Sequence, residues 1–265
     1  MSIYMFHYVK EQSNYFHFNL TKFEEFVKEN KDKIISIREY VIASNEDKIV
    51  LTFDDGTLDH YTNVFPILKK YGVTGVFSVS DNVITRDILI VQKIHKLMEI
   101  VGIDKVYDDL IKIYTEKTSD ELLSIYETKE RVIKKLLQKD LNLDLRLEIL
   151  DKIIVKNKLD IKFEDLYLNM DMVREMQEYG NEFVYHTKNH CWLGTLNKEE
   201  QMEEIRNVRE FIDKYGFINA LTLPFGDYNQ DTIDISKKLD IDFIIGVSYT
   251  NNKKCLVRVD CSTLA

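Results

Sequence analysis

Residues 48–77, KIVLTFDDGTLDHYTNVFPILKKYGVTGVF, carry the clearest signal of the fold class. It opens with an apolar segment, 49–53, which is short and rich in β-branched residues and therefore predicts a buried strand. The strand ends on two consecutive carboxylates, Asp54 and Asp55, and Gly56 follows at once. A buried charge must be paired or bound to a metal, so packing alone does not explain two acids at the end of a strand.

The acid pair lies where α/β proteins carry their chemistry. The segment 61–71 has apolar residues on one face and predicts a helix, and 73–79 predicts a second strand, so the stretch forms a βαβ unit. Ligands of α/β folds bind at the carboxyl ends of the strands. Asp54 and Asp55 therefore mark a candidate active site at that edge of the sheet.

The composition is that of an ordinary globular protein with 265 residues, of which 45% are hydrophobic and 31% charged. The net charge is -9 and there is no basic block. Nucleic acid is therefore not an expected partner, because phosphate binding needs clustered cations. The first residues lack the pattern of a signal peptide, and no window approaches the roughly 18 apolar residues of a spanning helix. With three cysteines that fit a reducing compartment, we expect a cytoplasmic protein without an integral membrane segment.

Strands and helices alternate over most of the chain, which predicts a parallel sheet with helices outside it. The segment 84–168 differs: it contains no proline, Gly102 is its only glycine, and its apolar residues recur at helical spacing. We interpret 84–168 as a helical insertion within a single domain that comprises residues 1–265. The insertion could be a lid, a surface for a partner, or a subdomain without a function of its own.

Three segments together resemble the polysaccharide deacetylase family, the NodB-like group of carbohydrate esterase family 4. Residues 52–56, Thr-Phe-Asp-Asp-Gly, resemble its first motif, and residues 186–190, His-Thr-Lys-Asn-His, resemble its His-Thr-x-x-His motif. Residues 223–228 contain a Pro-Phe-Gly segment similar to the one that forms a wall of the family's groove. The resemblance implies a distorted (β/α) barrel of the NodB-homology type and a metal-dependent amide hydrolase.

A metal site is expected from the histidine pair together with the acid pair. Two histidines spaced i and i+4 can direct both imidazoles toward one ion if they lie on a helical turn, and a carboxylate from another strand completes three ligands. Three protein ligands leave open positions for water and substrate, as in catalytic sites. With the resemblance, we assign Asp55, His186 and His190 as ligands of a divalent metal. Zinc is the first candidate, and Fe, Co and Ni are alternatives.

The resemblance also implies the other parts of the site. Asp54 would be the general base, and the backbone N–H of Phe225 would contribute to stabilising the oxyanion. Pro224 and Tyr228 belong to the segment that forms the groove wall and are expected to contact substrate. Trp192 could stack on a sugar ring or, equally, fill the core.

The sequence departs from the family pattern at the arginine that usually holds the base. That arginine stands two residues before the proline, and this chain has Thr222 there. Arg258 could reach Asp54 from another direction, or it could be a surface arginine.

A second departure concerns the catalytic acid. No histidine follows His190, so the usual C-terminal motif cannot supply one. Residues 6–9, Phe-His-Tyr-Val, resemble an N-terminal segment that carries the acid in one branch of the family. His7 is therefore the candidate acid, and a structural histidine is the alternative.

The leading function is metal-dependent hydrolytic N-deacetylation of an N-acetylated sugar. The expected cytoplasmic location favours a nucleotide- or lipid-linked precursor in surface polysaccharide biosynthesis. Two alternatives remain open: a hydrolase of a non-sugar amide or formyl group on the same fold, and an inactive relative that binds a glycan or a partner. The sequence does not indicate the oligomeric state.

Overall fold

The computed structural model describes residues 2–13, 16–42, 47–114, 116–247 and 255–261. The chain forms two compact units. Among the described residues, the first unit comprises 2–12, 16–87 and 166–261, and the second comprises residue 13 and 88–165. Within these residues, no helix has the length and apolar character needed to cross a membrane.

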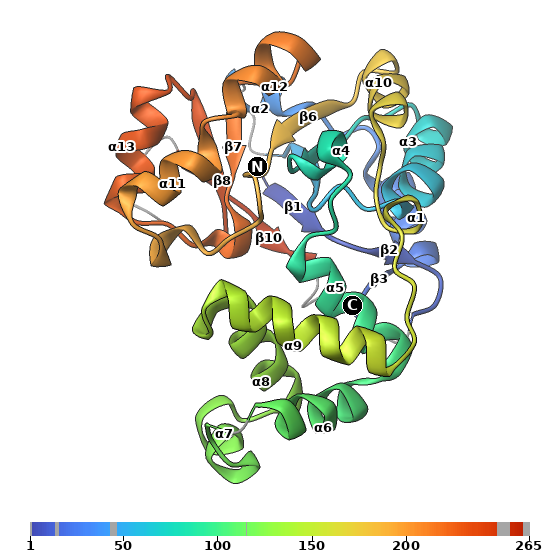
Figure 1. Cartoon of the computed structure of the whole chain (residues 1–265). Helices are drawn as coiled ribbons and strands as arrows, with labels where there is room; N and C mark the ends of the chain where they lie inside the picture. Colours follow the sequence, from blue (N-terminus) through green and yellow to red (C-terminus); the bar gives the residue numbers. More distant parts are fainter. Residues whose placement is uncertain (1, 14–15, 43–46, 115, 248–254, 262–265) are drawn as a thin grey trace. The chain divides into compact units, whose positions relative to one another are not determined.

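The first unit is built on a nearly closed parallel barrel of eight strands (Figure 1). Its strands follow the order β10-β1-β4-β5-β6-β7-β8-β9, and every neighbouring pair is parallel. The predicted distorted (β/α) barrel is therefore confirmed. The strands are β1 (Ser2–Phe6), β4 (Ile49–Phe53), β5 (Val76–Val79), β6 (Glu182–Tyr185), β7 (Ala220–Thr222), β8 (Phe243–Gly246), β9 (Cys255–Val257) and β10 (Val259–Asp260).

The last described segment joins the two edges of this sheet. β9 pairs with β8, whereas β10, drawn in red, pairs with the blue β1 (Figure 1). Arg258 lies between the two short strands, and its backbone N–H donates to the Gly246 carbonyl at 3.2 Å. The seam of the barrel thus places a buried arginine next to the strand that carries the acid pair.

Alternate residues of the strands face two different cores. Leu51 and Phe53 belong to a large cluster that includes helix residues, so they lie between the sheet and the helices. Val50 belongs to a cluster made mainly of strand residues, on the other face of the sheet. Because side chains alternate along a strand, Thr52 and Asp54 follow Val50 to that inner face.

Helices cover the outside of the barrel. The predicted helix 61–71 begins instead as a π-helical turn, η1 (His60–Val64), and continues as α3 (Phe65–Tyr71). Pro66 stands at the junction, and since proline has no N–H, it cannot continue the regular ladder. The predicted strand 73–79 is shortened to β5, because Val73 N–H still closes the end of α3 on the Leu68 carbonyl.

The remaining helices of this unit are α1 (Leu20–Asn30), α2 (Ile37–Ile42), α4 (Asn82–Thr85), α10 (Met170–Glu178), η4 (Leu193–Thr195), α11 (Lys198–Ile205), α12 (Val208–Tyr215), η5 (Pro224–Gly226) and α13 (Gln230–Lys238). A small sheet pairs β2 (Val9–Lys10) with β3 (Phe18–Asn19).

The second unit is helical, as the spacing of apolar residues predicts. It contains α5 (Ile90–Val101), α6 (Ile103–Ile113), α7 (Ser119–Tyr126), α8 (Lys129–Lys135), η2 (Leu136–Asp140), α9 (Leu143–Lys156) and η3 (Phe163–Asp165). Fully buried residues such as Leu110, Ile133 and Ile149 give it a core of its own. That the segment 84–168 is an insertion within one functional domain stays a prediction.

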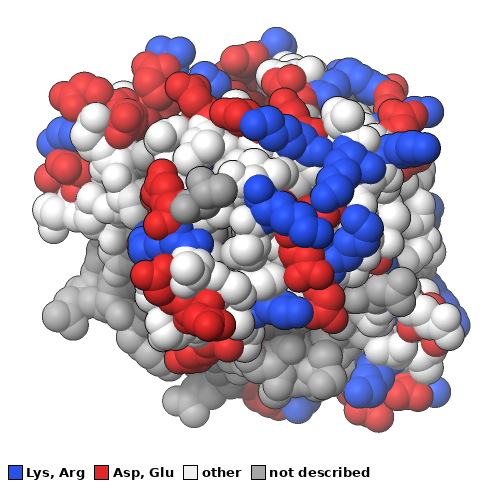
Figure 2. Space-filling view, turned by 60° about the horizontal axis from the view of Figure 1, so that its bottom comes forward, with Lys and Arg blue, Asp and Glu red and all other residues white. Residues whose placement is uncertain are grey.

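Charges of both signs are mixed over the surface that Figure 2 presents. Lysine and arginine side chains lie beside aspartate and glutamate side chains, with uncharged residues between them (Figure 2). Among the described residues, several ion pairs join side chains one helical turn apart, such as Lys134–Glu130 and Lys214–Glu210. Exposed pairs of this kind contribute little to stability, because water and salt screen them.

Candidate active site

The acid pair stands on a sharp turn at the carboxyl end of β4. Asp55 has a φ of 75° and Gly56 a φ of 59°, both left-handed. A Cβ on Gly56 would lie 2.7 Å from Val79 Cγ1, so only glycine fits there without a shift. The turn directs Asp54 and Asp55 into the protein, where both are buried.

The structure brings Asp55 together with both predicted histidines. Asp55 Oδ1 lies 3.0 Å from His190 Nε2 and 3.5 Å from His186 Nε2, and all three side chains are buried. One potential ligand atom from each residue lies within 4.8 Å of the other two. This spacing suits one ion bound between them.

His186 and His190 lie on a loop and not on the helical turn that their i, i+4 spacing suggests. Thr187 and His190 have φ values of 67° and 56°. This double left-handed backbone brings the two imidazole rings to 4.7 Å between centroids. Left-handed residues other than glycine, and β-branched ones above all, are unusual and are found where a site requires them.

A carbonyl on the neighbouring strand orients His186. His186 Nδ1 lies 2.9 Å from the Thr222 carbonyl, to which it donates. The proton is then on Nδ1, and the lone pair of Nε2 faces Asp55. Thr222, at the position where the family has arginine, therefore orients His186 through its backbone carbonyl. The Thr222 hydroxyl accepts a hydrogen bond from Ser78 Oγ at 2.9 Å.

The donor set fits a divalent cation. In the described part of the chain, Asp55 Oδ1 is buried without a hydrogen-bond partner, although it faces two imidazole nitrogens. Burial opposes ionisation of Asp55, but His190 and His186 outweigh it and hold the pKa of this carboxyl well below its usual range. An anionic oxygen with two imidazole nitrogens is a ligand set typical of Zn2+ and of related transition metals.

Arg258 is a buried partner of Asp54 and not a surface residue. Its Nη1 donates to Asp54 Oδ1 at 2.7 Å and its Nη2 to Oδ2 at 2.8 Å. Nη1 also lies 3.3 Å from Thr52 Oγ1, and Nε donates to the Gly246 carbonyl at 3.3 Å. Burial opposes ionisation of Asp54, but Arg258 and His186 outweigh it and lower its pKa below the usual range.

His7 lies just after β1, close enough for its charge to lower the pKa of both Asp54 and Asp55. Its Nδ1 is buried and has no hydrogen-bond partner among the described residues. Its backbone is held by His60, whose Nε2 donates to the His7 carbonyl at 2.6 Å. Sequence reasoning missed His60, because its role depends on β1 lying beside β4.

The Pro-Phe-Gly segment lies against His190. Phe225 has a φ of 57°, and its ring meets the His190 ring edge-on at 4.8 Å. Trp192 stacks on the Phe225 ring, at 4.3 Å between centroids and 7° between planes. Both aromatic residues are half-buried. In the part of the chain that the structure describes, the Phe225 N–H has no hydrogen-bond partner, so it is available to a ligand.

The predicted substrate residues at the ends of this segment differ in exposure. Pro224 is buried and begins η5, whereas Tyr228 is half-buried and packs against the core. Gly226 approaches Val247 so closely that a Cβ would lie 2.2 Å from Val247 Cγ2. The wall is thus a tightly packed turn with Phe225 at its tip.

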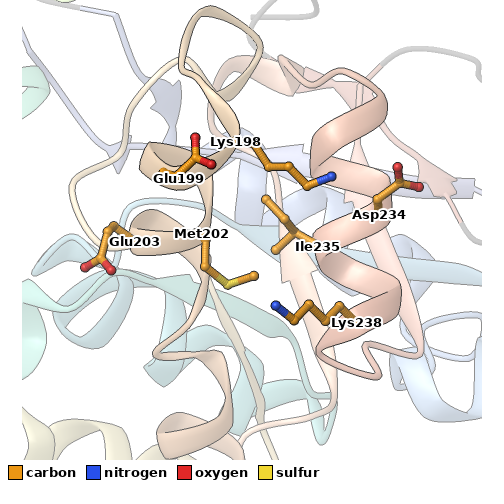
Figure 3. A pocket seen from close by; sticks show the side chains of 7 residues that line it. All are labelled: Lys198, Glu199, Met202, Glu203, Asp234, Ile235 and Lys238. Carbon is orange, nitrogen blue, oxygen red and sulfur yellow. The ribbon is translucent and has the colours of Figure 1, made fainter.

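A separate pocket of about 390 Å³ lies between α11 and α13. Figure 3 shows that side chains of both helices line it: Lys198, Glu199, Met202, Glu203, Asp234, Ile235 and Lys238. None of the predicted site residues is among them. Its charges are of both signs, so it shows no preference for an anion or a cation.

Buried acids and histidines at the carboxyl ends of parallel strands define a (β/α)-barrel enzyme. The family model described as polysaccharide deacetylase matches residues 42–147 and 149–244. The chain therefore belongs to the polysaccharide deacetylase family, whose members are hydrolytic enzymes. The resemblance seen in the three motifs is confirmed, as is the prediction of an enzyme. No curated protein matches the chain.

Solved structures of similar fold include a deacetylase, a deacetylase domain and a third protein, IcaB. The Streptococcus pyogenes deacetylase PplD in complex with acetate is 18% identical, with a TM-score of 0.61 over 98% of this chain and 91% of that one. IcaB from Ammonifex degensii is 13% identical, with a TM-score of 0.58 over 97% and 90%. The deacetylase domain of BpsB from Bordetella bronchiseptica is 15% identical, with a TM-score of 0.55 over 98% and 96%. At these identities the likeness shows the fold.

Proposed function

We propose that this protein is a divalent-metal-dependent hydrolase that removes the acetyl group from an N-acetylated sugar. The observation that carries the proposal is the meeting of Asp55, His186 and His190 around one point, directly beside Asp54. Membership of the polysaccharide deacetylase family supports the same reaction.

The three residues would hold the metal, with Zn2+ as the first candidate. A divalent ion bound there supplies an acidified water and polarises the acetyl carbonyl. His186 is kept in the required tautomer by the Thr222 carbonyl. Asp55 contributes the negative charge of the ligand set.

Asp54 accepts the proton of the attacking water. Its bidentate pair with Arg258 holds both carboxylate oxygens in place and keeps them ionised. The Phe225 N–H donates a hydrogen bond to the developing oxyanion, and His7 donates a proton to the departing amine.

The sugar is expected to contact the stacked rings of Trp192 and Phe225. Aromatic faces pack against the C–H faces of pyranose rings, and this pair lies directly beside His190. Among the similar structures, PplD is a deacetylase that was solved with acetate. We infer a substrate that occurs in the cytoplasm, either a nucleotide-linked or a lipid-linked precursor of a surface polysaccharide.

The test is acetate release from three N-acetylated substrates: a nucleotide-linked sugar, a lipid-linked sugar and the free sugar. We expect release with one of the linked substrates, and a fall of about 10²–10⁴-fold in Asp54→Asn, since a general base contributes on this order. Asp171→Asn, an exposed acid paired with Arg174, is the matched control and should keep full activity. Equal release by wild type and Asp54→Asn would overturn the assignment.

A further inference from the structure

The loop that carries the two histidines is held by one buried carboxylate, that of Glu204 in the last turn of α11. Glu204 Oε2 accepts from the Asn189 backbone N–H at 2.8 Å, and Oε1 accepts from Asn189 Nδ2 at 2.6 Å. The backbone carbonyl of Glu204 accepts from the Lys188 N–H at 2.9 Å and from the Tyr185 hydroxyl at 3.2 Å. Four hydrogen bonds from the segment 185–189 therefore converge on Glu204.

This loop needs external support. Thr187 and His190 are both left-handed, and within the loop the Thr187 hydroxyl supports this shape by accepting from the His190 N–H at 3.2 Å. A backbone in such a conformation persists only where its surroundings hold it. Glu204 holds the residue that directly precedes His190.

Packing does not account for a carboxylate at this position. Glu204 is 5% exposed, and no ion pair joins it to a cation among the described residues. A buried carboxylate without a cation is costly, so an apolar side chain would suit simple packing better. What a carboxylate adds is two strong, directional hydrogen bonds to Asn189.

The same helix end is fastened to β6 at a second point. The Tyr185 hydroxyl shares its one proton between the Glu204 carbonyl and Asp81 Oδ1, which lies closer at 2.7 Å, and Asn207 Nδ2 donates to Asp81 Oδ2 at 2.6 Å. Tyr185 directly precedes His186. The junction of α11 and α12 therefore supports the loop at both histidines.

We propose that Glu204 is a positioning residue for His190. It acts through Asn189 and sets the backbone from which His190 reaches the metal, so that it raises the affinity of the site for a divalent ion. This inference rests on the proposed function, because it requires His190 to be a ligand.

The test measures Co2+ binding to the full chain by competition with a chelator, together with the visible absorption of the bound ion. Outer partners of metal ligands typically change metal affinity about 10–100-fold. We expect the dissociation constant of Glu204→Ala to rise by at least about 10-fold, with a changed spectrum, and Glu204→Gln and Asn189→Ala to lie between it and wild type. Glu203→Ala is the matched control, since Glu203 is an exposed neighbour paired with Arg206.

Wild-type affinity and spectrum in both Glu204→Gln and Asn189→Ala would overturn the inference, whether or not Glu204→Ala folds. These two variants remove part of the hydrogen bonding between Glu204 and Asn189 and change less of the packing than Glu204→Ala does. If wild type binds no Co2+, or if Asp55→Ala binds it equally well, the proposed function itself fails. Loss of binding in Asp55→Ala with unchanged binding in the Glu204 and Asn189 variants refutes the positioning role alone.

Discussion

Arg258 and Asp54 lie 204 positions apart in the chain and form a two-pronged ion pair, with N–O distances of 2.7 and 2.8 Å. Both side chains are buried. The pair forms because β9 and β10 join the edges of the barrel and place Arg258 beside the end of β4. A single contact thus links closure of the barrel to the orientation of the proposed base.

Removal of the arginine should destabilise the protein as well as inactivate it. In Arg258→Ala, Asp54 stays buried without its cation, and the free energy of unfolding should fall by about 3–5 kcal/mol. Arg258→Lys should cost less than Arg258→Ala, because a cation stays beside Asp54. It should still be less stable than wild type, because an ammonium group cannot bind both carboxylate oxygens in the same geometry. Urea denaturation measures both. Arg174→Ala, which removes an exposed pair with Asp171, should cost less than about 1 kcal/mol. An Arg258→Ala variant as stable as wild type would contradict the account.

Local pattern was enough to predict part of this molecule. The strand 49–53, the acid pair after it and the histidine pair stand out because each signal lies within a few residues. Arg258 could be named only as a candidate, since its contact depends on how the barrel closes. His60 and Glu204 were missed because their partners, His7 and Asn189, lie on other elements of the fold.

The histidine loop shows a different limit. The i, i+4 spacing indicates that His186 and His190 can share an ion, but the spacing alone suggests a helical turn. The structure reaches the same result with left-handed residues at Thr187 and His190. The sequence His-Thr-Lys-Asn-His does not itself favour left-handed residues at Thr187 and His190, because the hydrogen bonds that hold the loop go to Glu204.

The turn at Gly56 should tolerate no side chain. Gly56→Ala combines a left-handed φ with a Cβ 2.7 Å from Val79 Cγ1, whereas Gly72→Ala has a φ of 69° and open space. Gly72→Ala should therefore lower the free energy of unfolding only by the cost of a left-handed backbone at an alanine, about 1–2 kcal/mol. Gly56→Ala should cost more and should also weaken metal binding, because Asp55 directly precedes it. Thermal unfolding and metal titration of both variants test this, and equal losses in the two would contradict it.

His7 should be required for the rate but not for metal binding. His7→Ala should lower kcat by about 10²–10⁴-fold, the usual contribution of a general acid, while the metal content stays that of wild type. His17→Ala, a half-buried histidine of the same unit, is the control. Full activity of His7→Ala would return His7 to a structural role.

Asp109 should make the stability of the second unit depend on pH. Burial raises the pKa of Asp109, but Lys156, Asn157 and Lys105 outweigh it and lower the pKa below its usual range. The folded value then lies below the unfolded value of about 3.9. The stabilisation is therefore complete above about pH 5 and is lost as the pH falls toward the folded pKa.

The free energy of unfolding should accordingly fall more steeply from pH 5 to pH 3 in wild type than in Asp109→Asn. A series of denaturant titrations across this pH range measures both slopes. Asp108→Asn, at the exposed neighbouring position, should follow the wild-type slope. Parallel slopes for wild type and Asp109→Asn would show that the pair with Lys156 contributes nothing that depends on pH.

The most direct test of a metal site between Asp55, His186 and His190 is a crystal structure of the zinc-loaded protein with anomalous diffraction data. We predict one anomalous peak at about 2.0–2.2 Å from a carboxylate oxygen of Asp55 and from Nε2 of both His186 and His190. The peak should be absent in Asp55→Ala crystals soaked in the same way. Zinc bound elsewhere, or no peak between these three residues in the wild-type protein, would contradict the account.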